Sequence, residues 1–407
     1  MARPGQKAHP DRTITGSGQG EPDSLSLYIH IPWCRARCGY CDFNTYVLPA
    51  GRQSGSAGAG IPDSCPADPM GDYLAAVREE VRSAARESGP RHVRTVYFGG
   101  GTPSLMVASD YRRVLDGVRE VFDLDPDAEI TTEANPETLS AEHLEQMRET
   151  GVNRLSMGMQ SAVPHVLATL DRVHTPGRVV EAAAWARSAG FSNLSLDLIY
   201  GTPGESMADW ETSVDQALAL DPEHISAYSL IVEEGTPLAR RMARGEIPYP
   251  DEDDLADKYC LADEKFSGAG LEWYEVSNWA KPGFQCRHNM VYWHCDDWWG
   301  IGAGAHSFVG GKRWWNRRRP ETYASAVRAG SPVEGSEILT PEQARLEAVM
   351  LGIRLAEGVD MALLTPSELV RAENYVDSGH LVHHGTHLVC TLEGRLIADG
   401  ITREILD

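Results

Sequence analysis

Residues 25–41 read LSLYIHIPWCRARCGYC, an apolar run followed at once by three cysteines, Cys34, Cys38 and Cys41. Their C-x3-C-x2-C spacing can hold three corners of a [4Fe–4S] cluster from one loop and leaves the fourth iron open to an exchangeable ligand. A structural zinc site would need a fourth Cys or His at short range, and none follows. Because barrel enzymes place their chemistry at the carboxyl ends of strands, the position of the motif favours a cluster over chance.

Short apolar runs alternate with helix-period segments as far as about residue 235. The runs predicted to be strands are residues 25–31, 93–98, 129–133, 154–160, 193–200 and 224–232. The segments predicted to be helices are residues 72–87, 111–122, 141–150, 176–189 and 207–220. Repeated strand–helix–strand units indicate parallel strands joined by right-handed crossovers. Six such strands are fewer than a closed barrel needs, so we predict an α/β fold with an open, partial (β/α)6 TIM-like barrel.

Composition suggests how the chain is divided around this barrel core, residues 25–235. Residues 1–24 are polar and rich in Gly and Pro, which predicts a disordered tail. Residues 47–71 predict a flexible insertion, in which Cys65 is either an unpaired thiol or a fourth cluster ligand. Residues 236–335 should complete the barrel, and residues 336–407 should form a small C-terminal α+β domain. In that domain we expect a helix at residues 341–357, a hairpin of residues 387–392 and 395–397, and a short apolar run at residues 402–406.

A run of glycines, Gly99, Gly100 and Gly101, follows the second predicted strand, and Thr102 comes next. Glycines expose backbone groups and allow close approach of a ligand, although a glycine run after a strand is more often a simple turn. Together with the cysteine loop, this run is a plausible cradle for the methionine part of a cofactor.

The chain resembles the radical SAM superfamily and, within it, the HemN/HemW-like group related to oxygen-independent coproporphyrinogen III oxidase. The resemblance covers residue 25 to the C-terminus and rests on motifs that occur in a fixed order. These are YIHIPWCRARCGYCDFNTY (28–46), YFGGGTPS (97–104), EANP (133–136), GVNRLSMGMQS (151–161), DRVHT (171–175), LDLIYGTPGES (196–206) and HNMVYW (288–293).

The resemblance implies an S-adenosylmethionine (SAM) site beside the cluster. It assigns Gly99, Gly100, Gly101 and Thr102 to the loop that binds the methionine amino group, and Arg172 is suited to pair with the methionine carboxylate. It also implies cofactor contacts for Glu133, Gln160 and Asp197. In an arbitrary fold, Glu133 would be a cap before Pro136, Asp197 a buried strand polar group and Arg172 a surface ion pair.

The group contains two activities, and the sequence leaves open whether this chain is an enzyme. One branch decarboxylates coproporphyrinogen III, whereas the other is regarded as a heme chaperone without that activity. The oxidase branch has a further cysteine two places after the third ligand and a longer segment before the cysteines. Here Phe43 occupies that place and 33 residues precede Cys34, which favours the chaperone.

The HNMVYW motif supplies a candidate heme ligand, His288. The resemblance implies a role for this histidine in heme binding, and a neutral imidazole is a good axial ligand for heme iron. Tyr292, Trp293, Trp298 and Trp299 could offer flat apolar faces to a porphyrin. Alternatively, His288 is a core histidine in a Trp-rich cluster, or Cys286 or Cys295 is the ligand.

The formal net charge of −22 argues against nucleic acid as a partner, because binding phosphates requires clustered cations. The one dense basic run, residues 312–319, is either a solvated loop or a local clamp for anions such as propionates. No apolar stretch is long enough to span a bilayer and no signal peptide is recognisable, so a cytoplasmic protein is expected. Expected partners are heme and heme-accepting proteins, with the chain a monomer or dimer.

Overall fold

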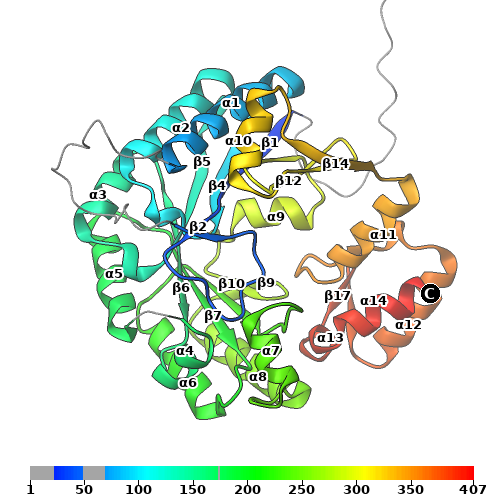
Figure 1. Ribbon diagram of the computed structural model, residues 1–407. Coiled ribbons are helices and arrows are strands. Elements are labelled where there is room, and N and C mark those ends of the chain that lie inside the picture. The colour runs from blue at the N-terminus through cyan, green and yellow to red at the C-terminus, as the bar shows by residue number, and fades with distance from the viewer. Residues whose placement is uncertain (1–22, 49–68, 173–174) are drawn as a thin grey trace, which may run out of the picture. The chain divides into compact units, whose positions relative to one another are not determined.

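The computed structural model describes residues 23–48, 69–172 and 175–407 (Figure 1). The predicted tail at 1–24 and the insertion at 47–71, including Cys65, therefore lie almost entirely outside the described residues. The chain divides into two compact units. One is formed chiefly by Glu21–Tyr292 and Asp296–Ile338, and the other chiefly by Leu339–Asp407.

The large unit is organised on one 12-stranded sheet with the order β14-β13-β12-β11-β1-β4-β5-β6-β7-β8-β10-β9. Its centre contains the six predicted parallel strands: β1 (Ser24–Ile31), β4 (His92–Gly100), β5 (Asp123–Ala134), β6 (Arg154–Gln160), β7 (Leu194–Tyr200) and β8 (His224–Ser229). Burial on both faces explains why these strands read as continuous apolar runs in the sequence. The predicted α/β fold with an open parallel sheet is confirmed.

The crossover helices are α1 (Pro69–Ser88), α2 (Ala108–Val121), α3 (Ala141–Glu149), α5 (Pro176–Ser188) and α6 (Met207–Leu218). In Figure 1, α2, α3 and α5 lie outside the strands that they connect. In α2, Tyr111, Val114, Leu115 and Val118 follow the helical period and are buried, so one face of the helix packs on the sheet.

Beyond the predicted six, β11 (Trp298–Ile301) pairs parallel to β1 on the side away from β4. It is followed by antiparallel β12 (His306–Val309), β13 (Lys312–Asn316) and β14 (Val333–Ile338). On the other side of the sheet, β10 (Asn278–Ala280) and β9 (Glu272–Glu275) add antiparallel to β8. The aromatic-rich part of residues 236–335 is therefore an extension of the sheet.

Buried Glu80 on α1 fixes this extension. It accepts hydrogen bonds from the Gly302 amide (2.8 Å), Asn316 Nδ2 (2.6 Å) and the Tyr323 hydroxyl (2.5 Å). Tyr73, also on α1, donates to the His30 carbonyl at 2.7 Å and accepts from the Ala303 amide at 2.9 Å. These bonds connect α1 to β1, to the segment directly after β11, to β13 and to the helix that contains Tyr323.

The remaining helices of the large unit are α4 (Pro164–Thr169), α7 (Pro237–Ala243), α8 (Glu252–Gly268), α9 (Arg287–Trp293) and α10 (Pro320–Arg328). Short 3-10 turns lie at Pro103–Leu105 and Pro136–Thr138. No helix within the described residues is sufficiently long and apolar to cross a membrane.

The small unit contains α11 (Pro341–Gly352), α12 (Pro366–Asp377), α13 (Leu392–Leu396) and α14 (Ala398–Leu406), with a 3-10 turn at Met361–Leu363. Its three-stranded sheet has the order β15 (Val359–Asp360), β17 (His387–Cys390) and β16 (Leu381–His384). Val349, Ile353, Leu388 and Ile401 are fully buried in its core.

Two predictions for this unit were wrong in detail. The hairpin joins β16 to β17 around Gly385, whose φ of +62° suits a tight turn, and residues 395–397 take no part in it. Instead, Thr391 caps a helix by accepting a bond from the Gly394 amide at 3.1 Å. The helix that starts at Pro341 ends at Gly352, short of residue 357, and residues 402–406 belong to α14.

Candidate cluster and ligand site

The cysteine loop is closed by a small parallel ladder between β2 (Trp33–Cys34) and β3 (Tyr46–Val47). Cys34 ends β2, and the Cys41 amide donates to the Cys38 carbonyl at 3.3 Å, which turns the loop back on itself. All three thiols are free and half-buried. The loop therefore presents three sulfurs from one short segment beyond the end of β1.

Burial raises the pKa of the Cys34 thiol to about 11 and also raises the pKa of Cys41. Among the described residues, no three His, Cys, Asp or Glu side chains gather closely enough to hold a single metal ion. A cubane cluster spreads its thiolate ligands over separate irons, and three thiols presented from one loop are a donor set that fits it.

The glycine run at the end of β4 packs directly on the segment that leads to the cysteines. The Gly101 amide donates to the Ile31 carbonyl and the Thr102 amide to the Trp33 carbonyl, both at 2.8 Å. A Cβ at Gly101 would lie 2.6 Å from the Trp33 carbonyl oxygen, and one at Gly100 would lie 2.4 Å from the His30 ring. Gly100 also has a φ of +113°, so glycine is required there.

Glu133, at the end of β5, is hydrogen-bonded to the same run. It accepts from the Gly100 amide at 3.0 Å and from the Tyr97 hydroxyl at 2.9 Å. Burial raises its pKa to about 7. The alternative role of Glu133 as a cap is excluded, because the side chain that caps the turn at Pro136 is Asn135.

Arg172 lies between the cysteine loop and β6. Its guanidinium donates to Cys38 Sγ at 3.6 Å and to the Gly158 carbonyl at 3.0 Å, and its Nε is buried without a hydrogen-bond partner among the described residues. A Cβ on Gly158 would lie 2.7 Å from both Arg172 Nη2 and Gln160 Nε2, so the Arg172 and Gln160 side chains converge there. Gln160 itself has a φ of +63°, an unfavourable conformation for a side chain of this kind.

Asp197 on β7 completes the predicted cofactor set. It accepts from the Ser156 hydroxyl, with both carboxylate oxygens at 3.1 Å, and burial raises its pKa. A hydrogen bond from Ser226 and the positive charge of Arg154 partly offset this effect by stabilising the charged form. Glycines from β4, Glu133 from β5, Gln160 from β6 and Asp197 from β7 thus lie on successive parallel strands.

His288 on α9 is only 1% exposed, and both of its ring nitrogens are engaged. Nδ1 is 2.6 Å from the Thr95 hydroxyl and Nε2 is 2.8 Å from the Tyr292 hydroxyl. The ring stacks on Tyr97 with centroids 5.0 Å apart, and burial lowers its pKa to about 3. Heme ligation by His288 stays a prediction, and it would require Tyr292 to move.

The other proposed heme contacts lie in different surroundings. Cys286 is buried with its Sγ 3.6 Å from Glu129, and burial raises its pKa to about 12. Trp299 is buried and packs edge-on against Trp314, 4.8 Å between centroids. Trp298 instead packs edge-on against Tyr292 at 4.9 Å and lines a cavity with it. Cys295 is half-buried with a φ of +54°.

That cavity has a volume of about 750 Å³. Gly100 and Glu133 line one part of it, and Tyr292, Trp298, His306 and Trp315 line another. Phe43, two residues beyond Cys41, also contributes and is 64% exposed. A volume of this order fits a large organic ligand. The cavity therefore joins the predicted SAM residues to an aromatic wall formed by residues of β11, β12 and β13. His306 belongs to this wall and was not among the site residues predicted from the sequence.

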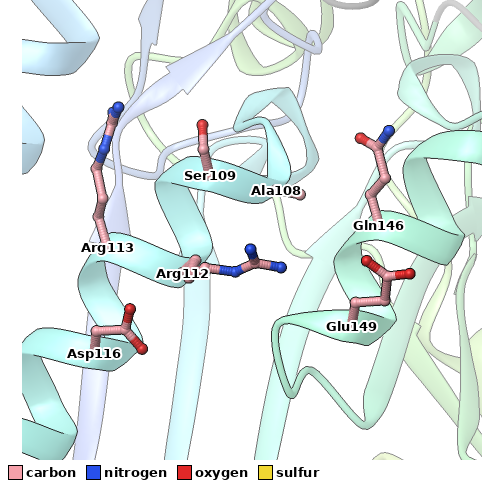
Figure 2. Close-up of a pocket in the computed structure, with 7 residues that line it drawn as sticks. All are labelled: Ala108, Ser109, Arg112, Arg113, Asp116, Gln146 and Glu149. Carbon is pink, nitrogen blue, oxygen red and sulfur yellow. The ribbon is translucent and has the colours of Figure 1, made fainter.

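A second cavity, of about 440 Å³, lies between α2 and α3 (Figure 2). Arg112, Arg113 and Asp116 from α2 and Gln146 and Glu149 from α3 line it. None of the predicted cofactor residues lines this cavity.

Comparison with known proteins agrees with this architecture. The family model described as the Radical SAM superfamily matches residues 28–217, and the HemN C-terminal domain matches residues 339–397. The solved structure of coproporphyrinogen III oxidase (HemN) from Escherichia coli aligns with a TM-score of 0.77 at 21% identity, covering 94% of this chain and 90% of that one. The chain is a radical SAM protein by fold and motif.

Within that superfamily, it belongs to the HemW family. It is 48% identical to the protein named heme chaperone HemW of Mycobacterium tuberculosis, over 95% of both chains. It is 36% identical to the protein of the same name from Bacillus subtilis, over 82% of this chain and 84% of that one. The mitochondrial radical S-adenosyl methionine domain-containing protein 1 of Bos taurus is 34% identical over 75% of this chain and 66% of that protein.

Proposed function

We propose that this chain is a heme chaperone, which binds heme and transfers it to acceptor proteins while carrying a SAM-bound [4Fe–4S] cluster. The observation that carries the proposal is the cavity of about 750 Å³ that runs from Gly100 and Glu133 to an aromatic and histidine-bearing wall. A porphyrin needs flat apolar surface and an axial ligand, and this wall offers both. The names of the HemW relatives support the same function.

Cys34, Cys38 and Cys41 would hold the cluster, with the fourth iron left for SAM. The buried Arg172 Nε without a partner supports an anionic ligand beside Cys38, such as the methionine carboxylate. Gly99–Thr102, Glu133, Gln160 and Asp197 would contact the rest of SAM. When both are bound, the reduced cluster would supply one electron to SAM, and the protein would contribute binding, orientation and shielding.

Coproporphyrinogen III oxidase activity was the alternative suggested by the sequence. The likeness to the oxidase structure, at 21% identity, reflects the shared fold alone. Phe43 lies in the cavity where the oxidase branch has a cysteine, which favours the chaperone. The HemW names of relatives at 36–48% identity point the same way.

An anaerobic assay separates the two functions. Reconstituted protein supplied with reductant, SAM and coproporphyrinogen III should form no protoporphyrinogen, whereas heme added to the same preparation should bind and then pass to a heme-free acceptor hemoprotein. Turnover of coproporphyrinogen would contradict the proposal. We further propose a cytoplasmic location and heme-accepting proteins as partners.

A further inference from the structure

Three histidines lie in or beside the aromatic part of the large cavity, and they differ in what their rings contact. His30 and His288 are buried, and each has both ring nitrogens hydrogen-bonded: those of His30 to the Tyr28 hydroxyl and the Asn44 carbonyl, both at 3.0 Å. His306, at the start of β12, is exposed and lines the cavity. Within the described part of the chain, the His306 ring makes no hydrogen bond, so both of its nitrogens can accept a new partner.

The orientation of the His306 ring is set by β13. His306 and Trp315 are paired across the two strands, and their rings stack with centroids 5.9 Å apart and planes 26° apart. A stacked partner holds the plane of an imidazole while leaving its nitrogen edges accessible. The Trp315 ring is held in turn by Gly335, where a Cβ would lie 2.4 Å from the indole. The stacking contact therefore sets the plane of the His306 ring and leaves its two nitrogens accessible to a ligand.

The backbone on either side of His306 is equally fixed. The His306 carbonyl accepts a hydrogen bond from Trp298 Nε1 at 3.1 Å. Gly302, four residues earlier, is bound to Glu80 on α1. Sites built on strands whose neighbours are locked in this way hold a ligand in one geometry.

The cavity around His306 has the apolar surface and the cationic side chain that a tetrapyrrole with propionate groups would need. Trp298, Tyr292 and Phe43 supply apolar cavity surface, and Arg318 lines the same cavity with an exposed side chain. The Arg318 carbonyl accepts from Asn44 Nδ2 at 2.8 Å and from the Tyr46 hydroxyl at 3.2 Å, which ties this residue to the segment beyond Cys41. A guanidinium placed there suits a carboxylate such as a propionate, although Glu334 also lines the cavity and would have to face away from it.

We propose that His306 is the axial ligand that this chain offers to heme iron, with Trp315 as its positioning residue and Arg318 as a propionate contact. The inference rests on the proposed heme-binding function and names the residue through which it acts. Partial burial of the ring, together with the positive charges of Arg313 and Arg318, lowers the pKa of His306, which favours the neutral form of the imidazole that binds metals.

The test is heme titration of the anaerobically reconstituted full chain, with the Soret band and resonance Raman spectrum recorded for wild type, His306→Ala and His384→Ala. His384 is the matched control, because it is an exposed strand histidine of the small unit. We expect His306→Ala to weaken heme binding by more than about tenfold, since even groups that only support metal ligands are worth ~10–100-fold in affinity. We expect the iron–imidazole vibration to disappear in that variant alone.

His306→Gly provides a second readout, because added imidazole should restore the wild-type spectrum if the side chain was the ligand. Circular dichroism and iron content establish that each variant folds and holds its cluster. A wild-type spectrum and affinity in His306→Ala would overturn the inference while leaving heme binding intact. Failure of wild type itself to bind heme would overturn the proposed function, so the two failures are distinguishable.

Discussion

The backbone amide of Gly100 donates a 3.0 Å hydrogen bond to the carboxylate of Glu133, so the glycine run after β4 is held by the residue that ends the neighbouring strand. The Tyr97 hydroxyl holds the other carboxylate oxygen at 2.9 Å. Glu133 thus holds the backbone of the glycine run that we propose as part of the SAM site. Both Gly100 and Glu133 line the large cavity.

Replacing Glu133 by Ala should weaken SAM binding by roughly tenfold or more, because the Gly100 amide loses its acceptor and the loop loses its shape. Cluster assembly should be unaffected, since Glu133 is not among the proposed ligands. Equilibrium binding of SAM and iron content would be measured on the same preparation. Glu145→Ala, an exposed residue of α3, is the control. Unchanged SAM affinity in Glu133→Ala would remove Glu133 from the site.

Replacing Cys34, Cys38 or Cys41 singly by Ala should abolish stable binding of the cluster, because each would supply one of only three protein ligands. Iron and sulfide analysis after anaerobic reconstitution measures this directly. Cys390→Ala is the control, because Cys390 is buried in the core of the small unit. Full iron content in Cys38→Ala would contradict the assignment.

Arg172→Met should retain the cluster but bind SAM more weakly by about tenfold or more, since it removes the cation proposed to pair with the methionine carboxylate. Arg172→Lys should recover only part of the loss, because an ammonium cannot reproduce the paired donors of a guanidinium. The same binding assay tests both variants, and equal affinity in all three proteins would show that Arg172 only supports the loop through Cys38 and Gly158.

His288→Ala should lower the free energy of unfolding by about 2–4 kcal/mol, because it opens a cavity beneath Tyr97 and leaves Thr95 and Tyr292 without partners. The folded fraction should still give a histidine-ligated heme spectrum if His306 is the ligand. Denaturant unfolding and heme titration together test both statements. A stable variant without the iron–imidazole signature would instead favour His288 as the ligand.

Stability should depend on pH through Glu80. Burial raises its pKa from 4.5 to about 7 in the folded protein, so the folded state holds a proton that the unfolded state has lost. The contribution of Glu80 to the free energy of unfolding is therefore largest below pH 4.5 and decreases as pH rises to 7. Glu80→Gln should reduce this slope in denaturant titrations. An identical slope in the variant would contradict the assigned shift.

The sequence was sufficient to predict the parallel core, because strands buried on both faces appear as apolar runs separated by helix-period segments. It was also sufficient to bring the glycine run and Glu133 to one site, since parallel strand ends share an edge. It missed β11, a four-residue strand hidden in a Trp-, Gly- and His-rich stretch. The β16–β17 hairpin could have been found, because Gly385-Thr386 is a two-residue turn between alternating runs.

The different surroundings of His288 and His306 could not be predicted from the sequence. His288 stands in a distinctive motif and His306 does not, yet the fold buries the ring of His288 between Thr95 and Tyr292 and exposes that of His306. Which imidazole has free nitrogens depends on the packing of strands far apart in the chain, and no local pattern encodes it.

Equilibrium titration of the reconstituted full chain with heme is the decisive measurement of whether the protein carries heme. We expect a saturable Soret band that corresponds to one heme per chain, and we expect the heme to pass to a heme-free acceptor hemoprotein when one is added. A spectrum that stays equal to that of free heme at every protein concentration, with no saturation, would contradict it.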